Sequence, residues 1–433
     1  MIPRIIQTNP KKELTLDINA LSYGPYGIGR HGGKAVMIAG TAPGDTVTAR
    51  IIEDKGRYAV GELVHLSSAS PVRQSPPCPY VTECGGCPWQ HVNYEAQLRA
   101  KQKSVEDALR RIGKLDHFEL RPIIASPLEY HYRRRIRLQR DHKKRLGFFR
   151  SFSHELVEIE SCLIADEKLN RVIETLRQWS TALETPISHL EIVRGDQAGQ
   201  IVVAGLAAGT FNARDNTLCE NLSAQPGSVD GLVLRGPDWR RAWGETAISI
   251  VPEADLCLKI DGDVFTQINS EGNRQLVHHL LGAGEFNRDD RVLELYSGAG
   301  NFTLPIANRS GNVVAVEAYR PAIDNGRRSA QSNGIANIDW LCSPAPPALA
   351  RLRKNRDRFS KIVLDPPRAG AKGIARDLPS LGAEKVLYIS CDPTTLARDL
   401  AALTKQGYTL DTVQPIDFFP HTFHVETIAT LLR

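Results

Sequence analysis

Short segments in which apolar and polar residues alternate follow one another along the first part of the chain. They span residues 14–18, 35–38, 45–52 and 59–64, and glycine-rich turns separate them. Several short strands joined by tight turns predict a small β-barrel over residues 1–66. Small barrels of this OB-like kind bind RNA in some proteins and are plain structural modules in others.

The middle of the chain, residues 67–262, has a mixed pattern. Residues 67–77 are rich in serine and proline and have the composition of a linker. Apolar residues then recur with helical spacing over 93–114, and strand-like runs with one helix near 165–180 fill the remainder. The pattern predicts a central α+β domain, with the helical segment at 93–122 as a candidate to pack on the C-terminal domain.

From residue 263 onward, apolar strands and amphipathic helices alternate regularly. The expected strands are 292–295, 313–316, 338–341, 361–364 and 386–389, and the expected helices are 302–308, 320–333 and 394–404. Such alternation predicts a doubly wound, Rossmann-like α/β domain with parallel strands over residues 263–433. Ligands of these sheets bind beyond the carboxyl ends of the strands.

A glycine loop follows the first of these strands, in Glu294-Leu-Tyr-Ser-Gly-Ala-Gly-Asn301. Glycines allow a ligand to approach the backbone closely, and Glu317, at the end of the next strand, can accept both hydroxyls of a ribose. The loop has neither the three-glycine dinucleotide pattern nor the Lys-Ser/Thr pair of a triphosphate site. An acidic residue before the loop suits a cationic ligand without phosphate, which favours S-adenosylmethionine (SAM) over a nicotinamide cofactor.

The fifth expected strand ends on a thiol, Cys391. Carbon-5 of uracil is a poor nucleophile, but a thiolate that adds to carbon-6 turns the ring into an enolate whose carbon-5 can attack a methyl sulfonium. A base must then remove the carbon-5 proton so that the thiol can leave. Cys391 is the candidate nucleophile, and Glu426 is the candidate base. His424, on the same side of an expected C-terminal strand, is predicted to be a core or hydrogen-bonding residue rather than to act directly.

The sequence Asp365-Pro-Pro-Arg368 after the fourth strand limits which atom of a base can be the target of methylation. Methyltransferases that act on exocyclic amines carry an aromatic residue after Pro-Pro, which stacks on the flipped base. RNA cytosine-5 methyltransferases commonly carry a cysteine there. Arg368 occupies this position, which disfavours both reactions.

Charge and targeting signals add further expectations. The net charge is +5, and Lys and Arg are concentrated in residues 132–145. This basic run is equally consistent with RNA contact and with a solvated surface. The chain has no apolar run of about twenty residues and no signal segment, so a cytoplasmic protein without a membrane span is expected. Structural disulfides are rare in the cytoplasm, so the clustered members of the eight cysteines need another role.

Cys78, Cys84 and Cys87 lie within ten residues, and Cys162 is the natural fourth member of their set. Four thiolates suit either zinc or an iron–sulfur cluster, and spacing alone does not choose between them. The isolated Cys219, Cys257 and Cys342 are expected to be core residues.

In combination these segments resemble the RNA 5-methyluridine methyltransferase family over nearly the whole chain. The motifs that carry the resemblance are residues 265–269, 294–301, 365–370, 389–395 and 419–426. The barrel is similar to a TRAM domain. The resemblance implies that Cys391 is the nucleophile and Glu426 the base. It also implies that the methyl donor SAM is bound by Gln267, Tyr296, Asn301, Glu317 and Asp365.

The resemblance implies a 4Fe–4S cluster in the central domain, held by Cys78, Cys84, Cys87 and Cys162. Family members with this architecture act on 23S rRNA, so 23S rRNA is the implied partner, and no obligatory protein partner is evident. Two rival hypotheses stay open: the same chemistry on tRNA or another rRNA uridine, and a catalytically silent RNA-binding iron–sulfur protein. The segment 341–344 departs from the family, which often has Asn or Asp there beside the adenine.

Overall fold

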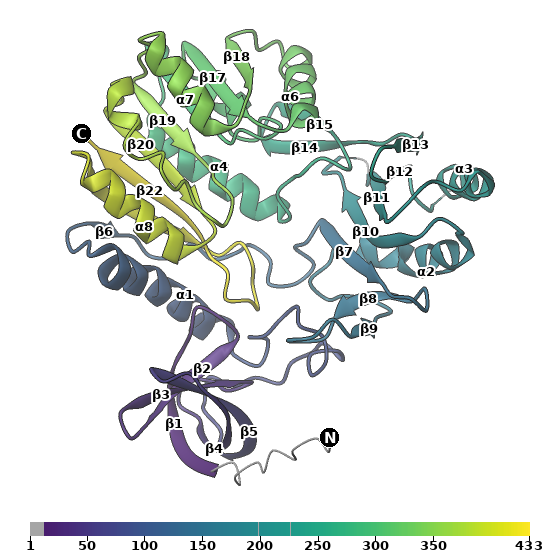
Figure 1. Cartoon of the computed structure of the whole chain (residues 1–433), viewed down its shortest axis with the longest axis vertical. Coiled ribbons are helices and arrows are strands. Elements are labelled where there is room, and N and C mark those ends of the chain that lie inside the picture. The colour runs from purple at the N-terminus through teal and green to yellow at the C-terminus, as the bar shows by residue number, and fades with distance from the viewer. Residues whose placement is uncertain (1–12, 198, 226) are drawn as a thin grey trace, which may run out of the picture.

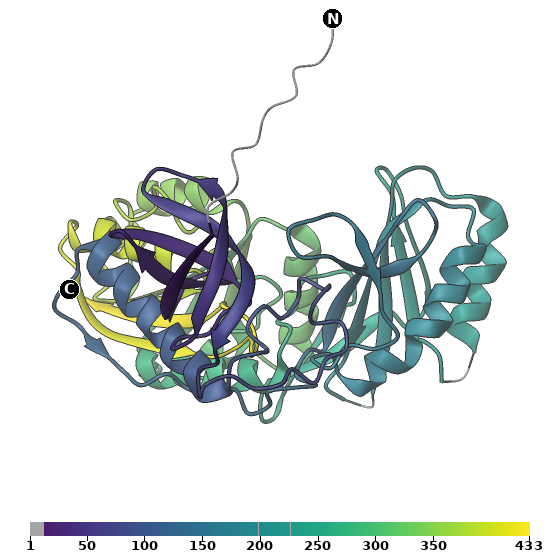
Figure 2. The same ribbon diagram turned by 90° about the horizontal axis from the view of Figure 1, so that it is seen from below.

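The computed structural model of the protein describes residues 13–197, 199–225 and 227–433. They form a barrel, a central domain and a C-terminal α/β domain (Figure 1). The barrel lies beneath the C-terminal domain, and the central domain extends to one side, as the view from below also shows (Figure 2). Residues 1–12 of the predicted barrel domain lie outside the described residues.

The N-terminal strands close into the predicted barrel. They are β1 (Glu13–Leu21), β2 (Tyr26–His31), β3 (Lys34–Ala39), β4 (Thr46–Asp54) and β5 (Tyr58–Ser68), in the order β1-β2-β3-β5-β4. Alternate residues such as Leu16, Ile18, Val36 and Ile38 point inward and form the barrel core. The period-two pattern of the sequence therefore places one face of each strand in the interior.

The central domain is built on a seven-stranded sheet in the order β13-β12-β11-β10-β7-β8-β9. Its strands are β7 (Arg135–Arg140), β8 (Leu146–Phe149), β9 (Leu156–Glu158), β10 (Ile187–Arg194), β11 (Ile201–Ala207), β12 (Gly231–Arg235) and β13 (Arg240–Gly244). Helices α2 (Glu167–Ala182) and α3 (Asn216–Ala224), the latter preceded by a 3-10 turn at Ala213–Asp215, share one apolar core with this sheet. The expected helix near 165–180 corresponds to α2.

A separate hairpin joins the central and C-terminal domains. It consists of β14 (Ala247–Glu253) and β15 (Leu256–Asp261). Its apolar residues share a core with Val193 and Val202 of the central sheet and with Ala322 and Ala330 of α6 (Arg320–Ser332). The two domains are therefore connected by a continuous apolar cluster as well as by the chain.

The C-terminal domain contains an eight-stranded sheet in the order β18-β17-β16-β19-β20-β22-β21-β6. Its strands are β6 (Glu119–Leu120), β16 (Arg291–Leu295), β17 (Asn312–Glu317), β18 (Ile338–Cys342), β19 (Lys361–Leu364), β20 (Lys385–Ser390), β21 (Thr409–Ile416) and β22 (Glu426–Leu432). The five predicted strands are parallel, whereas β22 runs antiparallel to β20. The predicted doubly wound parallel sheet is confirmed.

Helices cover both faces of this sheet. On one face α4 (Ser270–Gly284) and α5 (Thr303–Ala307) pack against it. On the other face lie α1 (Tyr94–Ala108), its π-helical continuation Leu109–Gly113, α7 (Ala345–Lys354), the 3-10 turn Leu378–Leu381 and α8 (Pro393–Thr404). Helix α1 contacts α8, and residues of α1 belong to the core of the C-terminal domain although they precede the central sheet in the sequence. Within the described residues no helix is long and apolar enough to cross a membrane.

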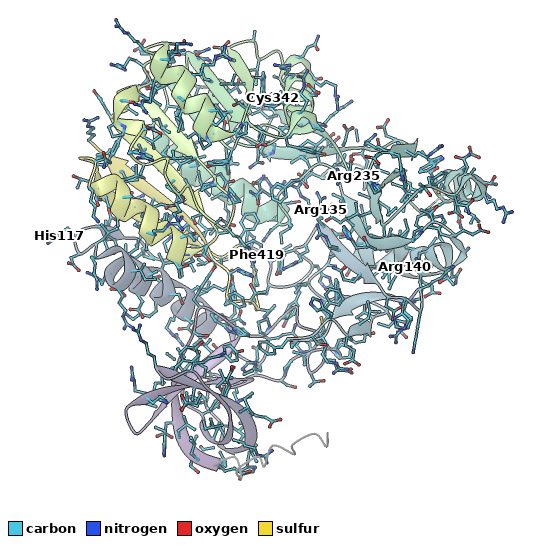
Figure 3. All side chains as sticks on the ribbon, viewed as in Figure 1. His117, Arg135, Arg140, Arg235, Cys342 and Phe419 are labelled. Atoms are coloured by element: carbon cyan, nitrogen blue, oxygen red, sulfur yellow. The ribbon has the colours of Figure 1, made fainter. Side chains whose placement is uncertain are left out.

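The expectation for the isolated cysteines is correct at one position of three. Cys219 is buried, but Cys257 is half-buried and Cys342 is exposed. Cys257 lies between the buried Leu256 and Leu258 of β15, where alternation turns it away from the core. Cys342 is the last residue of the edge strand β18, where few elements cover it (Figure 3).

Candidate active site

Four strands of the parallel sheet end at one edge, and each brings a polar side chain to it. β16 carries Glu294, β17 ends at Glu317, Asp365 follows β19, and Cys391 follows β20. The strand order reverses at β16, because β17 and β18 lie on one side of it and β19 and β20 on the other. In open α/β sheets, ligands bind in the crevice at such a switch point.

A cavity of about 710 Å³ opens at this edge of the sheet. Both residues predicted to be catalytic, Cys391 and Glu426, line it. The residues predicted to bind the methyl donor line it too: Gln267, Tyr296, Asn301, Glu317 and Asp365. The fold thus brings all seven predicted side chains around one space, although they come from segments far apart in the sequence.

The glycine loop after β16 turns sharply at the wall of the cavity. Tyr296 has a φ of +65°, which bulky residues rarely adopt, and Gly300 has a φ of +98°. A Cβ atom on Gly300 would lie 2.7 Å from Cδ1 of Leu304. Both its conformation and its surroundings therefore require glycine at position 300.

Hydrogen bonds orient two of the predicted donor-binding side chains. The carboxylate of Glu317 accepts from the backbone N–H of Gly298 (3.1 Å) and from that of Tyr319 (2.7 Å). Asn301 exchanges two amide hydrogen bonds with Asn273 of α4, at 2.8 and 2.9 Å. These contacts hold both side chains in place at the cavity wall, as a preorganised binding site requires.

Three carboxyl groups lie in or just behind the cavity wall. Glu294 and Glu426 are only 1% and 5% exposed, and Asp365 is half-buried. Burial raises the pKa of Glu294 and of Glu426 to about 8, and that of Asp365 to about 7. Oε2 of Glu294 has no hydrogen-bond partner among the described residues. A cationic ligand bound beside these carboxyl groups would stabilise their ionised forms.

The thiol of Cys391 is half-buried beside these carboxyl groups. Burial raises its pKa to about 12; the charge of Glu426 raises it as well, and the guanidinium of Arg368 opposes the rise. The thiol is therefore protonated at neutral pH in the free protein, although the thiolate is the nucleophilic form. Formation of the thiolate requires a change in the local charge, which a bound cation would supply.

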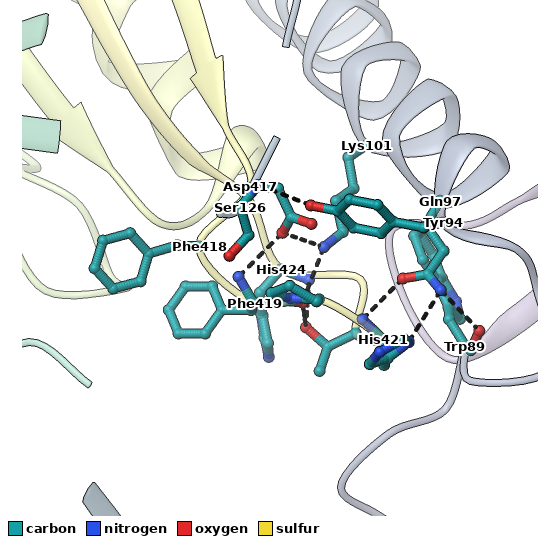
Figure 4. Close-up of polar contacts among 12 residues, drawn as sticks. Trp89, Tyr94, Gln97, Lys101, Ser126, Asp417, Phe418, Phe419, His421 and His424 are labelled. Carbon is teal, nitrogen blue, oxygen red and sulfur yellow. Dashed lines mark hydrogen bonds and ion pairs between the residues drawn. The ribbon is translucent and has the colours of Figure 1, made fainter. Parts of the chain in front are cut away.

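The loop between β21 and β22 leads into Glu426, and helix α1 holds it at His421. The side-chain amide of Gln97 donates to Nδ1 of His421 (3.2 Å) and accepts from the backbone N–H of the same residue (2.8 Å). The backbone N–H of Trp89 donates to the carbonyl of His421 (3.0 Å). Gln97, His421 and Trp89 are each 0% exposed, and Figure 4 shows them in one continuous network.

A buried ion pair holds the start of the same loop. Nζ of Lys101, on α1, donates to Asp417 at 2.6 Å and to the carbonyl of Phe419 at 2.9 Å (Figure 4). The side chains of Lys101 and Asp417 are both 0% exposed. A buried charge without its partner is strongly destabilising, so this pair strongly favours one position of the loop relative to α1.

His424 lies in this loop and not in the expected strand, because β22 begins only at Glu426. Its Nε2 lies 3.3 Å from a guanidinium nitrogen of Arg368, so it forms a hydrogen bond as predicted. Burial, and then Arg368, lower the pKa of His424 to about 3. The neutral imidazole accepts a hydrogen bond from the guanidinium and helps to hold Arg368 at the cavity.

Comparisons with known proteins decide the family. Residues 245–433 match the family described as tRNA (Uracil-5-)-methyltransferase, and residues 7–64 match the TRAM domain. The 23S rRNA (uracil(1939)-C(5))-methyltransferase RlmD of Pectobacterium carotovorum is 31% identical over 98% of this chain and 95% of its own length. The protein of the same name from Photorhabdus laumondii is 33% identical over 97% and 96%.

The chain belongs to the RNA (uracil-5-)-methyltransferase family. The methyltransferase also shares its fold with a solved structure, the Pyrococcus abyssi tRNA (uracil-54, C5)-methyltransferase in complex with S-adenosyl-L-homocysteine. The TM-score is 0.72 at 24% identity, over 97% of this chain and all of the other. The predicted enzyme class, a SAM-dependent RNA (uracil-5-)-methyltransferase, and the predicted TRAM domain are confirmed.

The four clustered cysteines of the methyltransferase line a second cavity, of about 510 Å³. They are Cys78, Cys84, Cys87 and Cys162. Burial, with a smaller contribution from Cys162 and Cys78, raises the pKa of Cys84 to about 11. Within residues 13–197, 199–225 and 227–433, however, no three His, Cys, Asp or Glu side chains are arranged to hold a metal ion. The four thiols therefore face one space without forming a tight ligand set.

Several arginines of the basic stretch form ion pairs within the methyltransferase, so fewer of its charges are free for RNA contact than the sequence suggests. Arg134 is 1% exposed, and Arg135 and Arg137 both pair with Glu191. Figure 3 shows Arg135 on the side of the central domain toward the C-terminal domain and Arg140 near the other end of β7. Internal carboxylates neutralise charge that the sequence alone presents as free.

The sequence did not single out two residues of the site. Glu294 entered the argument for a cationic ligand but was not named as a site residue, although an acidic residue in the apolar strand Val292–Leu295 signals a buried functional carboxylate. Phe265 lines the cavity and is 67% exposed. An exposed phenylalanine is visible only in three dimensions, because its sequence neighbours do not show whether it is covered.

The raised pKa of Glu426 predicts a pH-dependent effect on stability. A folded-state pKa near 8, against about 4.3 when unfolded, means that the folded state binds the extra proton between these values, so stability falls as pH rises through this range. We expect Glu426→Gln to melt close to the wild type at about pH 5 and several degrees higher at about pH 8.5. Thermal unfolding scans at both pH values measure this difference.

Glu384→Gln is the matched control, because Glu384 is exposed on the same domain. Its difference from the wild type should be the same at both pH values. If Glu426→Gln melts no higher than the wild type at about pH 8.5, the pKa of the Glu426 carboxyl is not raised in the folded protein.

Proposed function

We propose that this protein methylates carbon-5 of a specific uridine in 23S rRNA, with SAM as methyl donor and a covalent bond between Cys391 and carbon-6 as intermediate. The observation that supports this most directly is that Cys391 and Glu426 line the same cavity as the five residues proposed to bind the donor. A thiol, a base and a donor site around one space are the three requirements of the reaction.

The residues have defined roles in this proposal. The thiolate of Cys391 adds to carbon-6, and the electron pair of the 5,6 double bond moves into the ring as an enolate. SAM supplies an electrophilic methyl group, which carbon-5 takes up. The carboxylate of Glu426 then removes the proton from carbon-5, the double bond re-forms, and the Cys391 sulfur leaves as a thiolate. The pKa of Glu426, about 8, lies close to neutral pH, where a general base works best.

The cavity fits a sulfonium better than a phosphate-containing cofactor. The carboxyl groups of Asp365 and Glu426 in its wall, and of Glu294 behind the wall, have raised pKa values because they are buried. A cation would stabilise their ionised forms, whereas a pyrophosphate would meet repulsion. Gln267, Tyr296, Asn301, Glu317 and Asp365 are the residues proposed to hold the donor, with Glu317 as the acceptor for the ribose hydroxyls.

The choice of RNA rests on sequence identity. The relatives named as 23S rRNA methyltransferases match at 31% to 33% over almost the full length of both chains, barrel included. The Pyrococcus tRNA enzyme has the same architecture but only 24% identity. Because architecture does not discriminate, a tRNA or another rRNA uridine is the second candidate substrate. The target base must leave its stack to reach the half-buried thiol.

We further propose that the four-cysteine cavity holds a 4Fe–4S cluster. Four thiolates around one zinc ion would have sulfur atoms about 3.8 Å apart, given Zn–S bonds of about 2.3 Å. The four thiols line one cavity of about 510 Å³, and four cysteine thiolates are the usual ligands of a 4Fe–4S cluster. The thiols of Cys78, Cys84, Cys87 and Cys162 would be its ligands, and its role would be to shape the RNA-facing central domain.

The cluster proposal predicts the metal content. Protein purified without oxygen should contain iron and acid-labile sulfide in equal amounts, with broad visible absorbance, and Cys84→Ser should lose most of both. Elemental analysis and sulfide assay measure this, with Cys342→Ser as a control because Cys342 is exposed and does not line the cavity. Stoichiometric zinc without sulfide would reject the cluster.

The covalent mechanism predicts opposite effects of two substitutions. Glu426→Gln should accumulate a protein–RNA adduct that survives a denaturing gel, because elimination stalls when no base removes the carbon-5 proton. Cys391→Ala should form no adduct and lose turnover by at least about 10³-fold while it still binds RNA. Labelled 23S rRNA and tRNA, each incubated with SAM and the variants, provide the measurement.

The double variant Cys391→Ala/Glu426→Gln is the matched control and should give no adduct. An adduct on 23S rRNA alone supports the full proposal. An adduct on tRNA alone would move the substrate to the second candidate. Turnover that survives Cys391→Ala would remove Cys391 as nucleophile, and a wild type without activity on either RNA would favour the silent RNA-binding protein.

A further inference from the structure

A loop of the barrel reaches the nucleophile. The β1–β2 loop, residues 22–25, extends from the barrel toward the C-terminal domain, and the hydroxyl of Tyr23 donates a hydrogen bond to the backbone carbonyl of Cys391 at 3.0 Å. The ring of Tyr23 packs against the apolar core of the C-terminal domain. The two residues are 368 positions apart in the sequence, so neither local pattern reveals the contact.

The same ring packs edge-on against the loop that carries His424. Its centroid lies 5.6 Å from that of Phe423, with the planes at 83°, and 6.5 Å from that of His424, with the planes at 79°. Edge-to-face contacts at these distances are favourable. Tyr23 therefore touches the segments on both sides of the reacting centre, the turn of the thiol and the loop before Glu426.

The loop that carries Tyr23 is itself held firmly. The indole N–H of Trp89 donates to the carbonyl of Gly24 at 3.1 Å. The Ser22 hydroxyl donates to the carbonyl of Tyr26 and accepts from the backbone N–H of Tyr26. Because Trp89 also binds the carbonyl of His421, one buried indole residue ties the barrel loop to the loop before Glu426. The position of the phenol is thus fixed by the fold and not by its own contact alone.

The carbonyl of Cys391 needs such a donor. Cys391 follows the last paired residue of β20, Ser390, and precedes Asp392, the N-cap of α8. Its carbonyl therefore lies outside both the strand ladder and the helix, and Tyr23 is the donor that the described residues provide for it. The orientation of this peptide unit determines the direction in which the thiol projects from the turn.

We propose that Tyr23 is a positioning residue, through which the barrel fixes the turn of the Cys391 nucleophile and the ring of His424. The barrel would then take part in the covalent step as well as in RNA binding. The effect of Tyr23 on catalysis rests on the proposed function, whereas the hydrogen bond between Tyr23 and Cys391 does not. Burial and the charge of Asp392 raise the pKa of Tyr23, so its hydroxyl keeps its proton and remains a donor at neutral pH.

The test removes the hydroxyl and keeps the ring. We expect Tyr23→Phe to lower kcat about 2- to 10-fold, as the loss of one hydrogen bond does, with KM and Kd for RNA unchanged. Tyr23→Ala should lower kcat further, because the contacts with Phe423 and His424 are lost as well. In a Glu426→Gln background, Tyr23→Phe should slow adduct formation by the same factor as kcat.

Tyr26→Phe is the matched control. Tyr26 begins the next strand of the same barrel, its ring stacks on Phe152, and its hydroxyl has no hydrogen-bond partner among the described residues. Its kcat, KM and RNA affinity should equal those of the wild type. If Tyr23 had only a structural role, Tyr23→Phe would change the melting temperature but would not lower kcat while KM stays unchanged.

Amide hydrogen exchange separates this inference from the proposed function. In RNA-free protein, a peptide covering residues 390–396 should exchange faster in Tyr23→Phe than in the wild type and in Tyr26→Phe, because the turn loses its anchor. Unchanged exchange together with unchanged kcat would overturn the inference, as would a loss of RNA affinity with kcat intact. If the wild type methylates no RNA, the proposed function fails, and the exchange rates alone decide on Tyr23.

Discussion

The burial of carboxyl groups beside a thiol is the constraint on which the site depends. Parallel strands end at one edge of the sheet, so Glu294, Asp365 and Cys391 meet there, and β22 adds Glu426 from the antiparallel side. Because burial raises the pKa of all four groups, the free protein holds a protonated thiol and partly protonated carboxyl groups. A cationic ligand would shift all four toward their charged forms. Donor binding and activation of the nucleophile would then be one electrostatic event.

This site is also where the three domains meet. Helix α1 holds the loop before Glu426 through Gln97 and through the buried pair of Lys101 with Asp417. The segment that contains Cys78, Cys84 and Cys87 ends next to Trp89, which binds both the barrel loop and His421. Contacts from the barrel and central segment therefore bear directly on the catalytic loop. Through these contacts the barrel and the central segment can affect the chemical step.

The sequence predicts most of the architecture because its patterns are local. Period-two alternation gives the barrel, strand–helix alternation gives the parallel sheet, and the residues after each strand, such as Asp365 and Cys391, fall at one edge for geometric reasons. Contacts between distant segments leave no such pattern. The Tyr23 hydrogen bond, the neutralisation of Arg135 and Arg137 by Glu191, and the exposure of Cys342 all depend on which element packs where. These features could not be predicted from the local pattern of the sequence.

The central claim, that the sulfur of Cys391 bonds to carbon-6 of a uracil before the methyl group arrives at carbon-5, can be tested most directly with 23S rRNA that contains 5-fluorouridine. Fluorine at carbon-5 leaves no proton for Glu426 to remove, so the wild-type protein should stop at the methylated adduct. Mass spectrometry of the digested complex should find a peptide in which Cys391 carries a nucleotide with both fluorine and a methyl group. A nucleotide bound to another residue, or methylated RNA released without any adduct, would contradict the account.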